Sequence, residues 1–178
     1  MTNKNLGTLI LILGVTILPL MDRDSAWLWG ISVLAGCLAF WAWRQDNRWA
    51  TLLMSLFLWS VIAFEIRFFG LVGEVGSLAL LFLIGVLMFM WLLMRFDKPS
   101  LVLAYAAAIG LVEIFLILLF WPTNFSSRAL VIVIVGLIVA ELLECRHLAR
   151  PLKSLWPALG LSALSLVGVV LTSDWFSF

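Results

Sequence analysis

Long apolar runs follow one another along this chain, and each run is ended by charged residues, proline or a polar cluster. An apolar run of about 20 residues is long enough to cross the ~30 Å hydrocarbon layer of a bilayer as a helix. The sequence therefore predicts an all-α fold, a polytopic membrane helix bundle with seven transmembrane helices. The expected spans are Leu6–Met21, Ala26–Trp43, Trp49–Phe69, Ser77–Met94, Leu101–Trp121, Ala129–Cys145 and Trp156–Trp175.

The composition supports a membrane protein. Of the 178 residues, 65% are hydrophobic and 12% are charged, whereas a soluble domain carries about 25% charged residues. Because every connection between the apolar runs is short, residues 1–178 are expected to form a single integral membrane domain, with the lipid bilayer as its partner. The net charge of +1 and the lack of a basic stripe argue against nucleic acid as a partner. Cys37 and Cys145 form no CxxC pair, so the sequence predicts neither a disulfide framework nor a metal site.

The first run allows two interpretations. Lys4 followed by an apolar stretch is typical of a signal peptide, but the following segment "MDRDSA" contains no small-x-small cleavage site. We therefore expect an uncleaved first span. Seven spans are favoured over six.

The distribution of basic residues predicts the orientation. If seven spans alternate across the membrane, eight of the 11 Lys and Arg residues fall on one side. Cytoplasmic loops carry the excess of such residues, which places the N-terminus in the cytoplasm and the C-terminus outside. The compact chain favours a prokaryotic plasma membrane. The eight residues are Lys4, Arg44, Arg48, Arg95, Lys98, Arg146, Arg150 and Lys153, against Arg23, Arg67 and Arg128 on the other side.

The tryptophans and small residues give further expectations. Nine of the 10 tryptophans, Trp91 among them, fall at or near expected span ends, where an indole ring anchors a helix at the headgroup level. Trp59 is the exception, because it lies in the middle of the third span. Small residues spaced four apart let helix backbones approach one another. Such pairs occur at Ser32/Gly36, Ala106/Gly110 and Ala158/Ser162.

Glu113 is the one charged residue within the fifth span. At about 1.5 Å per residue from Leu101, it lies roughly 18 Å from the cytoplasmic boundary, near the bilayer midplane. A charge at that depth costs at least a few kcal/mol. One interpretation is a carboxylate that responds to protons or cations, or that contacts a substrate in a small cavity. The other is a neutral glutamic acid hydrogen-bonded across helices, which stabilises the bundle or a contact with a partner subunit. Polar residues at a similar depth are Thr16, Trp59, Ser60, Ser162 and Ser165.

Arg67 is a second candidate, near the outer end of the third span. It lies about 9 Å above Glu113 in depth, so an inward side chain could form an ion pair with Glu113. The alternative is an interfacial charge that reaches water beside a turn. The glycines at 70, 73 and 76 predict an outer loop, but they do not form a phosphate-binding motif.

The segment Ala140–Lys153 is expected at the cytoplasmic surface. Its basic residues Arg146, Arg150 and Lys153 predict contacts with anionic lipid headgroups. Glu141, Cys145 and His147 lack the spacing of a recognised metal site.

These observations predict a noncatalytic membrane component that packs against partner proteins or lipids. The alternative is a small-solute or proton- or ion-handling transporter subunit that uses Glu113, with Trp59, Ser60, Arg67 and Ser165 as further site residues. An intramembrane enzyme acting on lipid or peptide is a second alternative, which we do not favour. The spans contain no histidine, and the chain has neither a phosphate-binding loop nor a lysine in residues 156–175. We therefore expect no catalytic residue, cofactor or metal.

Overall fold

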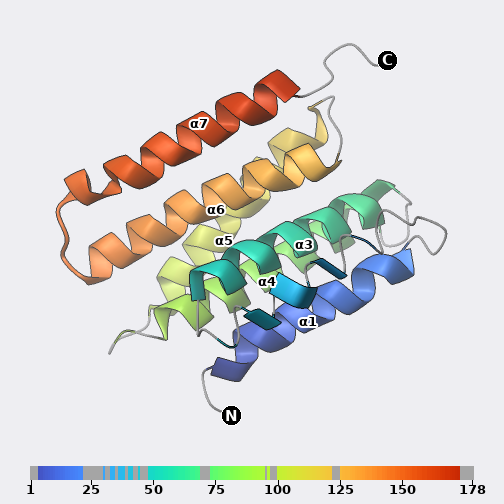
Figure 1. The fold of residues 1–178 in the computed structure, drawn as a ribbon, viewed down its shortest axis with the longest axis horizontal. Helices are drawn as coiled ribbons and strands as arrows, with labels where there is room; N and C mark the ends of the chain where they lie inside the picture. The colour runs from blue at the N-terminus through green and yellow to red at the C-terminus, as the bar shows by residue number, and fades with distance from the viewer. Residues whose placement is uncertain are drawn as a thin grey trace.

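The computed structural model describes most of the chain as a bundle of antiparallel helices (Figure 1). The described residues are 4–21, 30, 33, 34, 36–38, 40, 41, 44, 48–68, 73–94, 96, 100–121 and 125–172. No strand occurs among them. The elements are α1 (Lys4–Met21), α3 (Arg48–Phe68), α4 (Gly73–Leu93), α5 (Leu101–Leu119), α6 (Phe125–His147), the 3-10 helix η1 (Leu152–Leu155) and α7 (Trp156–Thr172).

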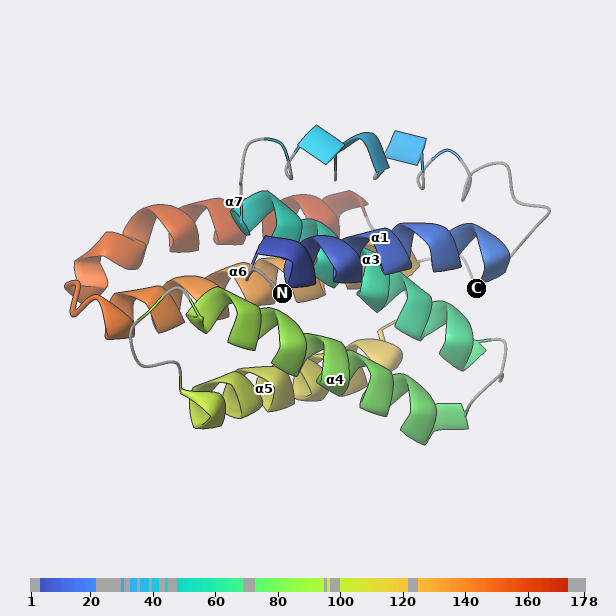
Figure 2. The ribbon, with the colours of Figure 1, turned by 90° about the horizontal axis from the view of Figure 1, so that it is seen from below.

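From α3 onward, successive helices alternate in direction. In Figures 1 and 2, α1, α3, α5 and α7 run one way, and α4 and α6 run the other way. Helices α1 and α3 are neighbours that run in the same direction. The chain that joins them therefore has to return along the length of the bundle, from the end of α1 to the start of α3. The expected second span, residues 26–43, lies mostly outside the described residues. The described residues between 30 and 44 are helical and lie along α1 (Figure 2).

Four segments are long and apolar enough to cross a membrane. They are Arg48–Arg67, Val75–Leu93, Leu101–Leu119 and Lys153–Leu171. The described part of α1 contributes a shorter apolar segment, Leu6–Ile17. Helix α6 is longer than any of these, but it carries Arg128, Glu141 and Glu144 towards its two ends. The all-helical bundle and its membrane-compatible helices therefore agree with the sequence.

Helix boundaries differ from the expected spans mainly where polar residues begin a helix. Helix α4 begins at Gly73, one turn before the expected Ser77, so part of the expected glycine loop is helical. Helix α6 begins at Phe125 instead of Ala129. The expected spans end at the first polar side chain, but a helix can continue past a polar residue because its hydrogen bonds join main-chain groups.

Helix α1 docks on α3 and α4 through two glycines. A Cβ atom built on Gly7 would lie 2.6 Å from the Trp91 ring, and one on Gly14 would lie 3.2 Å from Trp59 Nε1. These glycines are seven residues apart and share the buried face of α1 with Ile10 and Leu11. Trp91, which was expected as a membrane-surface anchor, is only 3% exposed. Both indoles therefore belong to the core, and the missing glycine side chains make room for them.

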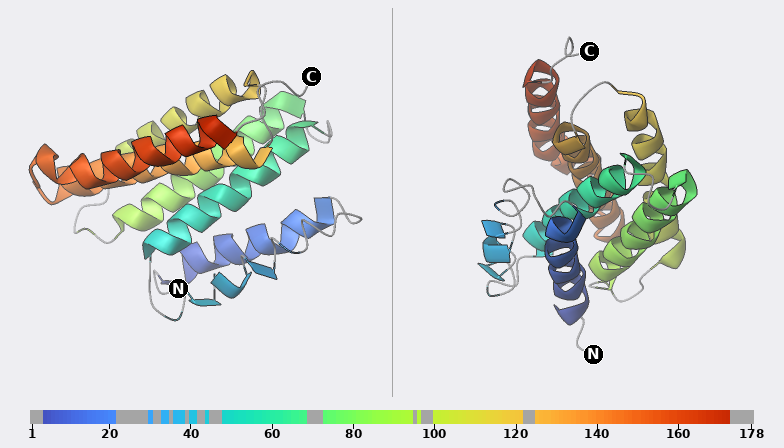
Figure 3. Two further views of the ribbon diagram at one scale, coloured as in Figure 1. Left: turned by 45° about the horizontal axis from the view of Figure 1, so that its top comes forward. Right: turned by 90° about the vertical axis from the view of Figure 1, so that its right-hand side faces the viewer.

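The centre of the bundle is formed by α3, α4, α5 and α6. Phe64 of α3 stacks on Phe115 of α5 with ring centroids 4.3 Å apart. Helices α4 and α5 approach closely, because a Cβ atom on Gly85 would lie 3.2 Å from the Cβ of Ala108. The buried share of the apolar segments is 61% in α3, 33% in α5 and 17% in the last segment, so α3 is the most enclosed of these three. Figure 3 shows α7 on the flank of the bundle beside α6.

Candidate functional site

Glu113 lies on the exposed face of α5. The same face presents Tyr105, Ile109 and Ile117, and Ile117 is 66% exposed. The Glu113 carboxyl forms no hydrogen bond or ion pair with another residue that the structure describes. The structure thus surrounds this carboxyl with exposed apolar side chains and not with the walls of an enclosed polar cavity.

The other residues expected near Glu113 lie elsewhere. Trp59 is 6% exposed and Ser60 is fully buried in α3. The Trp59 indole N–H donates a hydrogen bond to the main-chain carbonyl of Ile10 in α1, over 3.0 Å. Ser165 is exposed on α7. The structure therefore does not bring Trp59, Ser60 and Ser165 together with Glu113.

A groove of about 560 Å³ opens between α5 and α6, at the end of the bundle where α6 finishes. Its lining is mostly apolar, and small residues on α5 leave the space open. A Cβ atom on Gly110 would meet no other atom within 4 Å. Ala106 and Gly110, expected to promote a close helix contact, line this groove instead. The lining residues are Leu103, Ala106, Ala107, Gly110, Val139, Leu142, Leu143, Cys145, Arg146 and Arg150.

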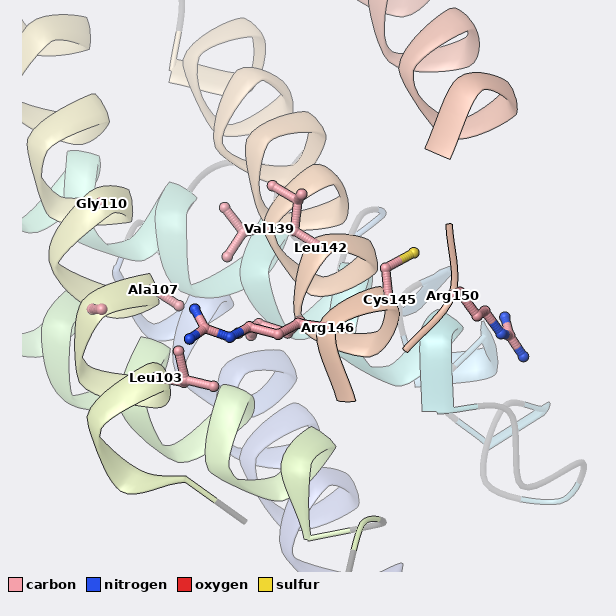
Figure 4. Close-up of a pocket in the computed structure, with 10 residues that line it drawn as sticks. Leu103, Ala107, Gly110, Val139, Leu142, Cys145, Arg146 and Arg150 are labelled. Carbon is pink, nitrogen blue, oxygen red and sulfur yellow. The ribbon is translucent and has the colours of Figure 1, made fainter. Parts of the chain in front are cut away.

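The basic residues predicted to contact lipid headgroups gather at this end of the bundle. Arg146 extends across the groove toward Leu103 and Ala107, whereas the Arg150 guanidinium points the other way (Figure 4). Arg150 is attracted by Glu141. Lys153 is exposed on η1 and does not line the groove. Arg146 is thus the residue that places positive charge within the groove.

The backbone turn after α6 determines where these side chains project. The N–H of Arg150 donates to the carbonyl of Cys145 over 3.0 Å, and Ala149 between them has φ +48°. This is the long hydrogen bond of a Schellman motif, which ends a helix with one residue in the left-handed region. A contact of 3.3 Å between Cys145 Sγ and Ser154 Oγ then connects α6 to η1.

The His147 ring connects the end of α6 to the turn after α4. It stacks on Phe96 with ring centroids 4.7 Å apart, and its Nδ1 lies 3.1 Å from the carbonyl oxygen of Leu143. These contacts give His147 a structural role. In the part of the chain that the structure describes, no group of three His, Cys, Asp or Glu side chains could hold a metal ion.

A second cavity, of about 390 Å³, lies at the opposite end of the bundle. It contains Arg67, the candidate partner of Glu113, but no ion pair joins these two residues. Leu116, one turn beyond Glu113 on α5, and Phe120, the residue that follows α5, also line it. Arg67 therefore approaches the α5 face that carries Glu113 without reaching the carboxyl.

Arg128 also lines this cavity, although its position in the sequence predicts only a charge on the outer side of the membrane. Its guanidinium lies over the rings of Phe64 and Phe125, 5.8 Å and 5.6 Å from their centroids. Burial lowers the pKa of this guanidinium from its ordinary value. The contact with Phe125 could be predicted from the sequence, because Arg128 follows it by about one helical turn. The contact with Phe64 could not, because the two residues are distant in sequence.

Comparisons of the chain with protein-family models, with curated proteins and with solved structures found no match. The fold and the two cavities are therefore the basis for any functional conclusion.

Proposed function

We propose that this chain is a noncatalytic, multi-pass membrane component that packs against partner proteins or lipids. It would cross a prokaryotic plasma membrane seven times, with the N-terminus in the cytoplasm and the C-terminus outside. The observation that carries this proposal is the position of Glu113 on the exposed, apolar face of α5.

An acidic side chain facing lipid near the bilayer midplane is energetically costly, by at least about 2.5 kcal/mol when charged. The cost falls when a hydrogen-bonding group of another molecule covers the carboxyl. Glu113 forms no such bond to the rest of the described chain. A contact outside the chain therefore accounts for Glu113 better than a transport pathway within the bundle.

The extent of apolar exposure favours the same proposal. Three large apolar side chains are more than 70% exposed: Val102 of α5, Phe120 directly after α5, and Leu171 of α7. Bilayer lipid or a neighbouring membrane protein can cover such side chains, whereas water cannot do so without a cost. The α5 and α7 sides of the bundle are thus the proposed packing surfaces.

Reconstituted ion flux tests the proposal against the transport alternative. Purified protein in proteoliposomes, under an imposed potential and pH gradient, is expected to give no more proton or cation flux than protein-free vesicles. Glu113→Gln is expected to leave this background unchanged. Flux through the wild-type protein that Glu113→Gln abolishes would overturn the proposal and support a transporter subunit.

Site-specific photo-crosslinking tests the packing surface directly. A photoreactive amino acid at Ile117, one turn from Glu113, is expected to give a product of discrete mass in native membranes. Glu113→Leu should lower the yield of that product, because it removes the polar contact. Leu83 on α4, which is 55% exposed, provides the matched control position, and its products should not change. Equal effects at both positions would contradict a role for Glu113 in packing.

A further inference from the structure

The groove between α5 and α6 combines apolar walls with positive charge at one end. Leu103, Ala106 and Gly110 of α5 face Val139 and Leu142 of α6 across it. Its volume of about 560 Å³ lies within the range of about 300–1,000 Å³ found for small-molecule sites. The groove thus offers a long apolar surface to a ligand and a cationic group at its end.

Arg146 supplies that cationic group, and its side chain forms no hydrogen bond or ion pair with any residue in the described ranges. Two carboxylates lie nearby on α6, Glu141 and Glu144. They are five and two residues before Arg146, so both project from sides of the helix away from the groove. Glu141 interacts electrostatically with Arg150 and Glu144. A guanidinium binds a phosphate group through paired hydrogen bonds.

We infer that this groove binds one anionic phospholipid, with its phosphate at Arg146 and an acyl chain along Ala106 and Gly110. The inference rests on the proposed function, which places this end of the bundle at the cytoplasmic membrane surface. Anionic lipids give that surface its negative potential. A partner helix or a second copy would fill the apolar part, but neither accounts for an arginine that is directed into it and pairs with none of the described residues. Charge complementarity therefore favours a lipid.

Two pairs of variants separate this site from general attraction to lipid. Arg146→Gln removes the charge within the groove, and Lys153→Gln removes a charge at the same end of the bundle but outside the groove. Gly110→Leu fills the groove, and Gly160→Leu makes the same change on α7. A Cβ atom at either glycine meets no atom within 4 Å, so both leucine variants should fold.

Native mass spectrometry of the full chain in detergent, titrated with phosphatidylglycerol or phosphatidylcholine of identical acyl chains, measures the binding. We expect one phosphatidylglycerol to bind in preference to phosphatidylcholine. Because paired hydrogen bonds from a guanidinium to a phosphate are stronger than those between neutral groups, Arg146→Gln should weaken that binding about tenfold or more. Gly110→Leu should weaken binding of both lipids. Lys153→Gln and Gly160→Leu should have much smaller effects.

Three results would overturn the inference. Equal losses for Arg146→Gln and Lys153→Gln would indicate surface charge alone, and unchanged binding in Gly110→Leu would show that no acyl chain occupies the groove. A dimer that Gly110→Leu dissociates, without a lipid-bound monomer, would identify a second copy as the occupant. None of these results depends on ion flux, so a failure of this site is distinguishable from a failure of the proposed function.

Discussion

The Trp59 indole N–H of α3 donates to the Ile10 main-chain carbonyl of α1 over 3.0 Å. Helical carbonyls have a second lone pair available, so this bond does not require α1 to unwind. Gly14 makes the approach feasible, because a side chain there would contact the indole. The mid-span tryptophan that did not fit an anchoring role is thus a connection between two helices.

Trp59→Phe is expected to destabilise the bundle by about 1–2 kcal/mol. The variant loses an interhelical hydrogen bond, which contributes about 0.6 kcal/mol on average in membranes, together with part of a buried aromatic side chain. Thermal unfolding in detergent measures the change. Trp41→Phe is the control, since Trp41 is 45% exposed and should change stability by less than about 0.5 kcal/mol. Equal effects of the two variants would argue against the Trp59–Ile10 bond.

Gly136→Ala is expected to be less stable than Gly160→Ala by about 1–3 kcal/mol. A Cβ atom on Gly136 would lie 2.5 Å from Cδ1 of Leu56, which is fully buried, so the core becomes overpacked. At Gly160 the methyl group meets open space and only improves helix propensity. Leu56→Ala should therefore cost less in the Gly136→Ala background than in the wild type, which a double-mutant cycle measures. Strict additivity would contradict this contact.

Ala149→Gly is expected to stabilise the protein by about 1 kcal/mol. Ala149 has φ +48°, a left-handed conformation that costs about 1–2 kcal/mol for residues with a Cβ atom and little for glycine. A higher melting temperature in detergent would confirm this. Ala163→Gly in the exposed part of α7 is the matched control, and it should lose about 0.5–1 kcal/mol. A loss of stability at both positions would show that the turn after α6 does not favour glycine.

Glu113→Gln is expected to leave the unfolding free energy of the isolated chain within about 0.5 kcal/mol of wild type. The side chain is exposed and has no partner in the described residues, so neither a cavity nor an unsatisfied partner results. Chemical unfolding of both proteins in the same detergent gives the comparison. A loss of more than about 1 kcal/mol would instead indicate a contact within the chain.

Reporter fusions test the proposed orientation. An alkaline phosphatase domain, which is active only outside the cytoplasm, should be active after Phe178 and inactive after Lys98. The reason is the excess of basic residues at the loops assigned to the cytoplasm. A green fluorescent protein fused at the same positions should give the inverse pattern. Activity at both sites, or the reverse assignment, would exclude an N-in, C-out bundle of seven spans.

Much of the helix arrangement follows from the sequence, because charged and polar residues interrupt the apolar runs at the helix ends. Helix α5 is one example: it begins at Leu101 as expected, and the side chain of Ser100, its N-cap, accepts a hydrogen bond from the Leu103 N–H. The faces of the helices were harder to predict. Helix α5 is apolar around its whole circumference except at Glu113, so no periodic pattern distinguishes its buried side.

The small residues illustrate the same difficulty. Ala106 and Gly110 match the spacing of a close helix contact, yet they line an open groove. Gly85 and Ala108, which were not singled out, make the close contact between α4 and α5. Small residues permit a close approach, but the partner helix decides where it occurs. Arg146 lies in the last turn of α6, as its charge after an apolar run predicts, and its contact with a lipid headgroup stays a prediction.

The tryptophan contacts of α1 also bear on how the protein is assembled during synthesis. Gly7 packs against the Trp91 ring, so this contact can form only after Trp91 has been translated. At about 5–20 residues per second, that interval is roughly 4–17 s. In the membrane insertion proposed here, the first helix would therefore enter the bilayer well before its packing register against α4 is determined. During that time the surface of α1 at Gly7, which the Trp91 indole covers in the folded bundle, is accessible to other molecules.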